Sequence, residues 1–403
     1  MEIRAPEMRQ LDEICDLAGK CFGQYFDFYA HCQGGYVRGS SYDWEASRVI
    51  LDAGRIVSHV GVWQYRMRVG QGRLKSGGIG IVMTDGRYRK QGLNTQVMNA
   101  TMTGMRDAGY DYSVLFGVKD YYHRFGFCQI WPWAKLRAEA ADLPETPLTL
   151  TLQERPLGEI LWGSGAVMDI YNRDNATRTG TAERPVYTIN ESPHWKDNRL
   201  HALVNTSGQT VGYVVATKDG ADLAVLEVGG LADDCGIGQL IAAIAALAKS
   251  NACTRVQVIN HSLGHPLMQA LHCGNCKLEI EHFRSGGPMG ATVNLRQCLG
   301  AMQEELSLRC ANSAWNDVST SLSIQGQDET VTLQLSNGQV RVMDEAASAN
   351  RLICGVLSAR LIVGSESPSD LLYQGLKGEG GALALAEVLF PPQCPMLHRL
   401  DAF

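Results

Sequence analysis

Residues 77–107 read GGIGIVMTDGRYRKQGLNTQVMNATMTGMRD, and this stretch predicts a strand, a loop and a helix in direct succession. Residues 77–84 are short and apolar, which is typical of a buried strand. Residues 95–107 are expected to be helical, and Gly109 would end that helix as a C-terminal cap. This strand–loop–helix unit is the strongest structural signal in the sequence.

The loop of this unit, DGRYRKQGLN at 85–94, carries three basic side chains, Arg87, Arg89 and Lys90. The first N–H groups of a helix have no internal partner, and the helix dipole adds positive potential at the same end. Gly92 lets the backbone approach an anion without a Cβ in the way. The loop therefore predicts a phosphate cradle, although a solvated basic turn would show the same residues. It contains neither a Walker A motif nor a G-x-G-x-x-G dinucleotide fingerprint.

A second feature follows the next expected strand, at 112–118. There the sequence YYHRFGF at 121–127 places two tyrosines before an aromatic-Gly-aromatic turn, which taken alone is interpreted as packing. At this distance from the basic loop, the two features together resemble the Gcn5-related N-acetyltransferase (GNAT) family. The acetyl-CoA loop of that family reads Arg/Gln-x-x-Gly-x-Gly/Ala, and RKQGLN at 89–94 is similar to it except at Asn94.

The resemblance to the GNAT family implies that acetyl-CoA binds as a co-substrate and that no metal is needed. The implied contacts come from the strand end, the basic loop, the helix start and the next strand. These residues are Val82, Met83, Thr84, Arg89, Lys90, Gln91, Gly92, Leu93, Asn94, Thr95, Gly117 and Val118.

The remainder of the chain predicts two further units. Residues 140–165 have the composition of a linker, with several prolines. Strands expected at 201–204, 210–216, 223–228 and 255–259, with a helix at 239–249, repeat the order of the first unit as an internal duplication would. A third unit would contain strands at 319–324, 330–335 and 339–343, helices at 295–306, around 346–358 and at 369–375, and a docked apolar tail.

A GNAT unit, a degenerate GNAT-like unit and a sterol-carrier-like unit, in that order, resemble the enhanced intracellular survival (Eis) acetyltransferases. The fold class is thus expected to be α+β (mixed α/β). Tandem GNAT-like domains would span 1–145 and 146–293, and a sterol-carrier-like (SCP2-like) α+β domain would span 294–403. The second domain is expected to bind no CoA, because Asp233 and Asp234 stand where the first has Arg87 and Arg89. The resemblance also implies a homo-hexamer.

The Eis resemblance implies two catalytic groups, Tyr122 as acid and the main-chain carboxylate of Phe403 as base. An alkyl ammonium has a pKa of about 10 and must lose a proton before its nitrogen attacks. A terminal carboxylate becomes a better base where an apolar pocket raises its pKa. Tyr122 would protonate the departing CoA thiolate, and a main-chain N–H near 82–84 would bind the oxyanion. Transfer is expected to be direct, without an acetyl-enzyme.

Three residues are candidates for binding a cationic substrate. Phe26 and Asp27 belong to an aromatic and acidic cluster, and Asp401 lies two residues before the last position. The resemblance implies an amine-bearing small molecule such as an aminoglycoside, and hence antibiotic resistance. Two alternatives stay open: acetylation of protein lysines or polyamines, and a non-catalytic lipid carrier acting through 294–403. The intact basic loop argues against the carrier.

Composition excludes several other classes. A length of 403 residues predicts two or three domains. With 36 basic and 42 acidic residues the net charge is −6, which argues against a general nucleic-acid binder. No apolar stretch is long enough to span a membrane and no signal peptide is evident, so a cytoplasmic protein is expected. Cys273 and Cys276 form a lone C-x-x-C, a weak metal signal, and His59 and His123 are expected to be structural.

Overall fold

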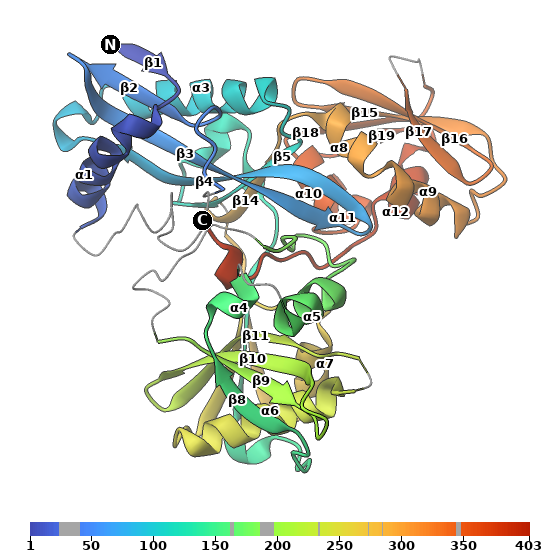
Figure 1. The fold of residues 1–403 in the computed structure, drawn as a ribbon. Coiled ribbons are helices and arrows are strands. Elements are labelled where there is room, and N and C mark those ends of the chain that lie inside the picture. The colour runs from blue at the N-terminus through green and yellow to red at the C-terminus, as the bar shows by residue number, and fades with distance from the viewer. Residues whose placement is uncertain are drawn as a thin grey trace.

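The computed structural model describes residues 1–23, 41–161, 165–185, 197–232, 234–272, 274–283, 285–343 and 348–403. Figure 1 shows this part of the chain as three units, each built on one sheet. The C-terminus lies where the first and central units meet (Figure 1). The predicted mixed α/β fold class is therefore confirmed. No helix within these ranges combines the length and the apolar character that a membrane span requires.

The first sheet carries the predicted strand–loop–helix unit. Helix α1 (Leu11–Phe22) covers one face and α3 (Leu93–Asp107) the other. Successive strand residues point to opposite faces of the sheet, so Leu51 packs with α1 and Ile50 packs with α3. The described strands of this sheet are, in order, β1 (Glu2–Arg4), β2 (Arg48–Asp52), β3 (Arg55–Val69), β4 (Gly72–Thr84), β5 (Tyr112–Gly117), β14 (Gly287–Thr292) and β6 (Cys128–Gln129).

The predicted strand, loop and helix of this unit are all present, but some of their boundaries differ from the predicted ones. Residues 77–84, expected as a short strand, form the second half of the longer strand β4, which pairs with β3 in a hairpin around Gly70. The glycines in this segment are compatible with a continuous ladder because β3 runs opposite them throughout. Helix α3 begins at Leu93, two residues before the predicted start at 95, directly after Gly92 in its left-handed conformation.

The central unit repeats the plan of the first. The order β10 (Thr210–Asp219), β11 (Asp222–Gly229), α6 (Gly236–Ser250) and β12 (Arg255–Ile259) matches that of β3, β4, α3 and β5. β11 pairs with β12 in parallel, as β4 does with β5. Helices α4 (Gly158–Leu161), α5 (Ala166–Asp174) and α7 (Pro266–His272) complete it. Its described strands are, in order, β13 (Cys276–Glu281), β7 (Trp133–Glu139), β12 (Arg255–Ile259), β11 (Asp222–Gly229), β10 (Thr210–Asp219), β9 (Arg199–Val204) and β8 (Thr151–Arg155).

The two units exchange strands. β7 precedes the predicted limit at 145 yet pairs with β12 in the central sheet. β14 follows that limit yet pairs with β5 in the first sheet. Neither sheet therefore keeps to the range 1–145 or 146–293, and the domain limits stay predictions.

The third unit is a smaller α+β layer. The helix predicted around 346–358 is wrong, because 351–355 form β18 (Arg351–Gly355) with Leu352 and Cys354 buried at strand spacing. Its helices are α8 (Leu295–Ala301), α9 (Gln303–Ala311), α10 (Ser358–Val363), α11 (Pro368–Leu372) and α12 (Ala382–Leu389). Its described strands are β17 (Gln339–Met343), β16 (Thr330–Ser336), β15 (Thr320–Gly326), β18 and β19 (Lys377–Glu379).

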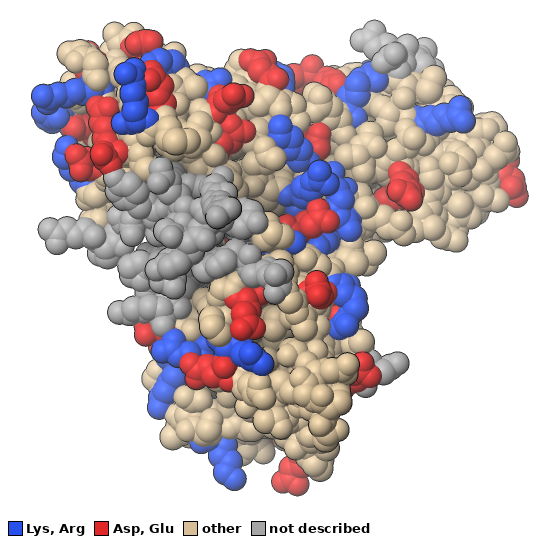
Figure 2. Space-filling view, in the orientation of Figure 1, with Lys and Arg blue, Asp and Glu red and all other residues tan. Residues whose placement is uncertain are grey.

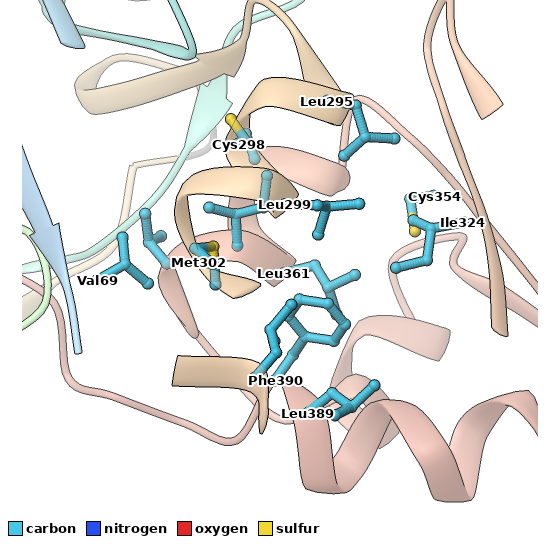
Figure 3. Packing of buried hydrophobic residues seen from close by; sticks show 14 of the residues in the cluster. Val69, Leu295, Cys298, Leu299, Met302, Ile324, Cys354, Leu361, Leu389 and Phe390 are labelled. Atoms are coloured by element: carbon cyan, nitrogen blue, oxygen red, sulfur yellow. The ribbon is translucent and has the colours of Figure 1, made fainter. Parts of the chain in front are cut away.

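The interior of the third unit is filled by its own side chains. Figure 3 shows Leu299, Met302, Leu361 and Phe390 converging between the helices and the sheet. Val69, at the end of β3, belongs to the same cluster (Figure 3), so the hairpin of the first unit packs on the third. From Phe390 the tail runs back toward the other two units, with Met396, Leu397 and Leu400 buried.

Candidate active site

The first sheet opens at the predicted strand–loop–helix. β4 and β5 pair in parallel only up to Ile79 opposite Leu115. Beyond that point β4 continues along β3 to Thr84, whereas β5 ends at Gly117. The two strands therefore part, and we call the space between them the opening.

A bulge in the β3–β4 pairing marks this opening. The register shifts between His59 and Gly61, and Ile81 adopts a φ of 49°, which is unusual for a β-branched residue. The His59 ring supports the bulge, with Nδ1 2.9 Å from the Ile81 carbonyl and Nε2 2.8 Å from the Tyr42 hydroxyl. Burial lowers the pKa of His59 to about 4, so the neutral ring donates through Nδ1 and accepts through Nε2. The structural interpretation of this histidine fits the geometry.

A cleft of about 370 Å³ lies at the end of β4. It brings together nine of the predicted coenzyme contacts, whereas Gln91, Gly117 and Val118 do not line it. The end of α1 forms its opposite wall through Cys21 and Phe22. The nine residues are Val82, Met83, Thr84, Arg89, Lys90, Gly92, Leu93, Asn94 and Thr95.

The cleft has the electrostatics of an anion site. Gly92 has a φ of 78° and precedes α3 without a side-chain cap, and the first turn of α3 contains no acidic residue. Arg89 and Lys90 line the cleft, but Arg87 does not, because it forms an ion pair with Asp85 at 3.0 Å. Hydrogen bonds from Arg87 hold the pKa of Asp85 at about 2. Of the three basic residues predicted for this loop, Arg89 and Lys90 therefore line the cleft and Arg87 does not.

The two adjacent tyrosines take different places. Tyr121 lines the cleft, and its hydroxyl donates to the side-chain oxygen of Asn94. Tyr122 is buried, with its ring centroid 4.9 Å from that of Tyr121 and 6.4 Å from that of Phe127. Burial, reinforced by the neighbouring Tyr121, raises the pKa of Tyr122 to about 12. Tyr122 therefore keeps its proton throughout the neutral range.

Phe403 lies on β4 beside the opening. Its ring centroid is 5.7 Å from that of Tyr65 and 5.9 Å from that of Phe116. A Cβ on Gly78 would lie 2.3 Å from the Phe403 ring, so only glycine at this position admits the ring. A Cβ on Gly80 would lie 3.2 Å from the carboxyl carbon of Phe403, which places that carboxyl group against the backbone of β4.

Tyr122 and Phe403 flank the opening from opposite faces of the sheet. Gly117 faces the α3 side, where a Cβ at this position would lie 2.9 Å from the Tyr122 ring. Phe116, the preceding residue on β5, faces the other side with Phe403. A phenol and a carboxyl group thus stand on either side of the point where β4 and β5 part.

The substrate-binding predictions have a different outcome. Phe26 and Asp27 lie outside the described residues. Asp401 is buried and its carboxylate is held by Arg184 at 2.8 Å, so it faces the protein interior rather than a cavity. Next to Phe403, a larger cavity of about 870 Å³ is lined by all three units and the tail, and its wall includes Phe116, Trp133 and Glu281.

Several residues of the site were not found from the sequence. Trp63, Tyr65 and Phe116 surround Phe403, and they read simply as strand residues. One signal was present: glycines at 77, 78 and 80 inside an apolar strand indicate a close approach by another part of the chain. The sequence could not show which part approaches.

The corresponding place in the central unit is occupied by a carboxylate. Asp174 accepts hydrogen bonds from the N–H groups of Gly230 and Leu231 at 2.6 and 2.9 Å, directly after β11 and ahead of the loop that leads to α6. Asp234 is exposed and Asp233 lies outside the described residues. A carboxylate on these N–H groups disfavours a phosphate beside them, and the expectation that this unit binds no CoA stays a prediction.

The lone C-x-x-C cannot be followed completely, because Cys273 lies outside the described residues. Cys276 is half-buried on β13. Within the ranges that the structure describes, no three His, Cys, Asp or Glu side chains gather as ligands for a metal. His123 lies in the turn Tyr122–Phe125 and is exposed.

The comparisons with known proteins agree with this geometry. Residues 2–130 match the family model described as an acetyltransferase (GNAT) domain. No curated protein matches the chain. The chain therefore contains a GNAT acetyltransferase domain, and this domain holds the cleft, the opening and Tyr122.

Solved structures share the fold over almost the whole length at low sequence identity. A GCN5-related N-acetyltransferase from Anabaena variabilis ATCC 29413 has a TM-score of 0.78 and 16% identity, with 100% of both chains covered. One from Kribbella flavida has a TM-score of 0.73 and 16% identity, with 98% of this chain and 99% of the other covered. Eis1 from Mycobacterium abscessus has a TM-score of 0.68 and 15% identity, with 98% and 99% covered.

Proposed function

We propose that this chain is an acetyl-CoA-dependent N-acetyltransferase that transfers the acetyl group directly to a primary amine of a small molecule. The observation that carries the proposal is the opening between β4 and β5. It adjoins a cationic cleft on one side and lies between the buried Tyr122 and the carboxyl group of Phe403. An anion cradle, a proton donor and a proton acceptor around one point suit acyl transfer from a thioester to an amine.

The cleft residues fit the phosphates of acetyl-CoA. Arg89 and Lys90 supply charge, and the uncapped first turn of α3 supplies N–H groups without a competing carboxylate. Gly92 leaves the backbone open to close approach. Other parts of the coenzyme would lie outside this cleft, and for these parts the proposed contacts are Gln91, Gly117 and Val118.

The proposed reaction balances without a covalent enzyme intermediate. The amine nitrogen bonds to the thioester carbonyl carbon, and the bond from that carbon to sulfur breaks. The nitrogen loses its proton to the main-chain carboxylate of Phe403, and the departing sulfur takes the hydroxyl proton of Tyr122. A main-chain N–H at the Ile81 bulge is the proposed donor to the carbonyl oxygen. The products are an amide and CoA, and the cycle closes when the Phe403 carboxyl group releases its proton to water and the Tyr122 phenolate takes one up.

We place the acceptor amine in the cavity of about 870 Å³, because Phe403 forms part of its wall. Its volume suits a drug-sized molecule. Acidic and basic side chains alternate on the face shown in Figure 2, without a broad area of one sign. The cavity wall is also mixed. It contains Trp131 and Trp133 together with charged residues of both signs, namely Glu279, Glu281, Glu366, Lys135, Arg360 and Arg399.

The acceptor class is tested by following CoA release with a panel of amines. The Eis resemblance favours aminoglycosides, and the mixed cavity wall also admits an amine on an apolar body. The panel therefore contains several aminoglycosides, a polyamine, a lysine peptide and an arylalkylamine. We expect turnover with at least one small amine. Turnover with the lysine peptide alone would favour the protein-acetylating alternative, and turnover with no amine would contradict the proposal.

Replacing Lys90 with Gln should raise the KM for acetyl-CoA by roughly threefold to tenfold, as expected for losing one solvent-exposed contact to a phosphate. The kcat should stay within about twofold, because Lys90 lines the proposed phosphate cleft and is not one of the proposed proton-transfer groups. The effect should shrink at high salt. Arg87→Gln is the matched control, since Arg87 is paired with Asp85, and equal effects of both variants would contradict the assignment.

For the third unit we propose a sterol-carrier-like domain with an architectural role. Its apolar interior contains Leu299, Leu361 and Phe390 rather than free space at that place (Figure 3), which disfavours the lipid-carrier alternative. The hexamer implied by the Eis resemblance is retained as a proposal. Light scattering on the purified protein tests it, and a monomer at micromolar concentration would contradict it.

A further inference from the structure

Arg184 lies at the centre of a buried ionic cluster in the central unit. Its Nη1 and Nη2 donate to the two carboxylate oxygens of Glu227 at 2.8 and 2.7 Å. Its Nε and Nη2 donate to the two carboxylate oxygens of Asp401 at 2.8 and 3.1 Å. All three side chains are at most 1% exposed. Burial alone would lower the pKa of Arg184, but the two carboxylates raise it well above its ordinary value, so the guanidinium stays charged.

Two tyrosines complete this cluster. The ring of Tyr171 lies against the guanidinium, 3.7 Å from its centre, and the Tyr171 hydroxyl is 3.0 Å from Asp401 Oδ2. Tyr213 donates its hydroxyl proton to Glu227 at 2.8 Å. Two bidentate pairs and two phenols satisfy charges that would otherwise be costly to bury. One member, Asp401, belongs to the tail, and the others belong to the central unit.

The cluster lies where the central sheet parts. β11 and β12 pair in parallel up to Val225 opposite Val258, and Glu227 lies two residues beyond, at a bulge in the β10–β11 pairing. Ile81 bears the same relation to β4 and β5 in the first sheet. The parting of β11 and β12 is therefore the counterpart, in the duplicated unit, of the opening that holds the candidate active site.

The tail occupies this counterpart along several residues. Ser262, just after β12, donates its hydroxyl proton to the Cys394 carbonyl at 2.7 Å. His398 places Nδ1 3.5 Å from a carboxylate oxygen of Glu227 on β11. Leu400 is buried in the same apolar cluster as Tyr171. Tail residues 394–401 thus contact β11 and the segment that follows β12, whereas Phe403 reaches the opening in the first sheet.

A short segment connects the cluster to the hairpin of the active site. Residues 180–183 run along β3, with Gly180 N–H donating to the Arg68 carbonyl at 2.8 Å and Arg68 N–H to the Thr181 carbonyl at 2.9 Å. Glu183 N–H donates to the Arg66 carbonyl at 2.9 Å. The residue that follows is Arg184. Arg184, which binds the tail through Asp401, therefore directly follows a segment that is hydrogen-bonded to β3, the strand that pairs with β4.

We propose that the parting of β11 and β12 is a binding site for the chain's own C-terminal segment, with Arg184, Glu227 and Tyr171 as positioning residues. Arg184 and Tyr171 contact Asp401, Glu227 fixes Arg184, and together these residues hold the carboxyl group of Phe403 at the opening. The catalytic part of this inference rests on the proposed function; the binding part does not. Two residues of chain span at most about 7 Å, so fixing Asp401 restricts the last carboxyl group to a small volume.

The test is the full-length Asp401→Asn enzyme, examined in two ways. Carboxypeptidase A digestion reports how often the tail leaves its site, because the protease needs a free end. We expect release of Phe403 to be roughly tenfold faster than in the unsubstituted enzyme, since the amide leaves Arg184 without one of its carboxylates. We expect kcat to fall roughly tenfold while the KM for acetyl-CoA stays within twofold.

Two further variants keep the test decisive. Tyr171→Phe removes the hydroxyl that contacts Asp401 but keeps the ring under Arg184, and it should give smaller changes in the same direction. If the Asp401→Asn enzyme does not fold, the same two measurements are made on the Tyr171→Phe enzyme instead. Asp222→Asn is the matched control, because Asp222 pairs with Arg255 on the same two strands but does not touch the tail. It should change neither measurement.

Each outcome decides one claim. Faster release of Phe403 together with a lower kcat supports the positioning site. Faster release with an unchanged kcat keeps the binding site but contradicts the role of Phe403 in the proposed function. Unchanged release contradicts the binding site, whatever happens to kcat. Equal effects of Asp222→Asn would show a general loosening of the central unit and would also overturn the inference.

Discussion

Adding one glycine after Phe403 should lower kcat at least tenfold, which corresponds to about 1.4 kcal/mol of lost transition-state stabilisation. The added residue turns the carboxyl group at Gly80 into a peptide carbonyl and moves the negative charge about 3.8 Å away. Gly80 and Trp63 leave little room for the chain to continue along β4. The KM for acetyl-CoA should not change, because the cleft at the end of β4 is not involved. Steady-state kinetics on both substrates measures the two effects separately.

The control for this prediction adds the same residue at the other end of the chain. Met1 is exposed, so a glycine before it should leave kcat unchanged. Thermal unfolding of both proteins shows whether either addition disturbs the fold. A C-terminally extended enzyme with the kcat of the unextended one would remove Phe403 from the mechanism.

Replacing Tyr122 with Phe should also lower kcat at least tenfold, a loss of about 1.4 kcal/mol or more. The ring contacts with Tyr121 and Phe127 survive in this variant, so the loss is that of the hydroxyl proton alone. A buried phenol with a high pKa is a weak acid in water. A CoA thiolate that leaves next to Tyr122 is also poorly solvated, so the pKa of the CoA thiol is raised as well. Proton transfer depends on the difference between the pKa of the Tyr122 phenol and that of the CoA thiol.

The pH profile sharpens the prediction for Tyr122. Because burial raises its pKa to about 12, the protonated form persists up to that pH, and the donor is lost only above it. The profiles of the Tyr122→Phe and unsubstituted enzymes should therefore run parallel between about pH 6 and 10. Tyr121→Phe is the control: it breaks the hydrogen bond to Asn94 and should affect the KM for acetyl-CoA more than kcat. If Tyr121→Phe lost kcat and Tyr122→Phe did not, the acid would be misassigned.

The sequence predicted the half of the site that is built from neighbouring residues. Strand, loop and helix follow one another within 77–107, so spacing, glycines and charge indicate the anion cradle directly. The boundaries shifted where glycine conformations decide them, as at Gly92 before α3. Local patterns also failed where a segment is short and apolar: residues 351–355 form a strand because β15 is available as a parallel neighbour.

The other half of the site depends on contacts between distant parts of the chain. Phe403 packs on Gly78 and Asp401 of the same tail pairs with Arg184, and no spacing along the chain relates these residues. Asp401 was expected near the substrate for its charge alone, yet the buried arginine takes that charge up. The sequence pattern could not predict the exchange of β7 and β14 between the two sheets either, because strands that pair need not be neighbours in the sequence.

The most direct measurement is the kcat of an enzyme in which the carboxylate of Phe403 is replaced by a carboxamide through peptide ligation. This change keeps the shape of the tail, its contacts with Tyr65 and Phe116 and its anchor at Arg184, and removes only the charge and the proton acceptor. We expect a kcat at least tenfold lower at an unchanged KM for acetyl-CoA and an unchanged melting temperature, because the proton acceptor is lost. A kcat equal to that of the unmodified enzyme would contradict this expectation.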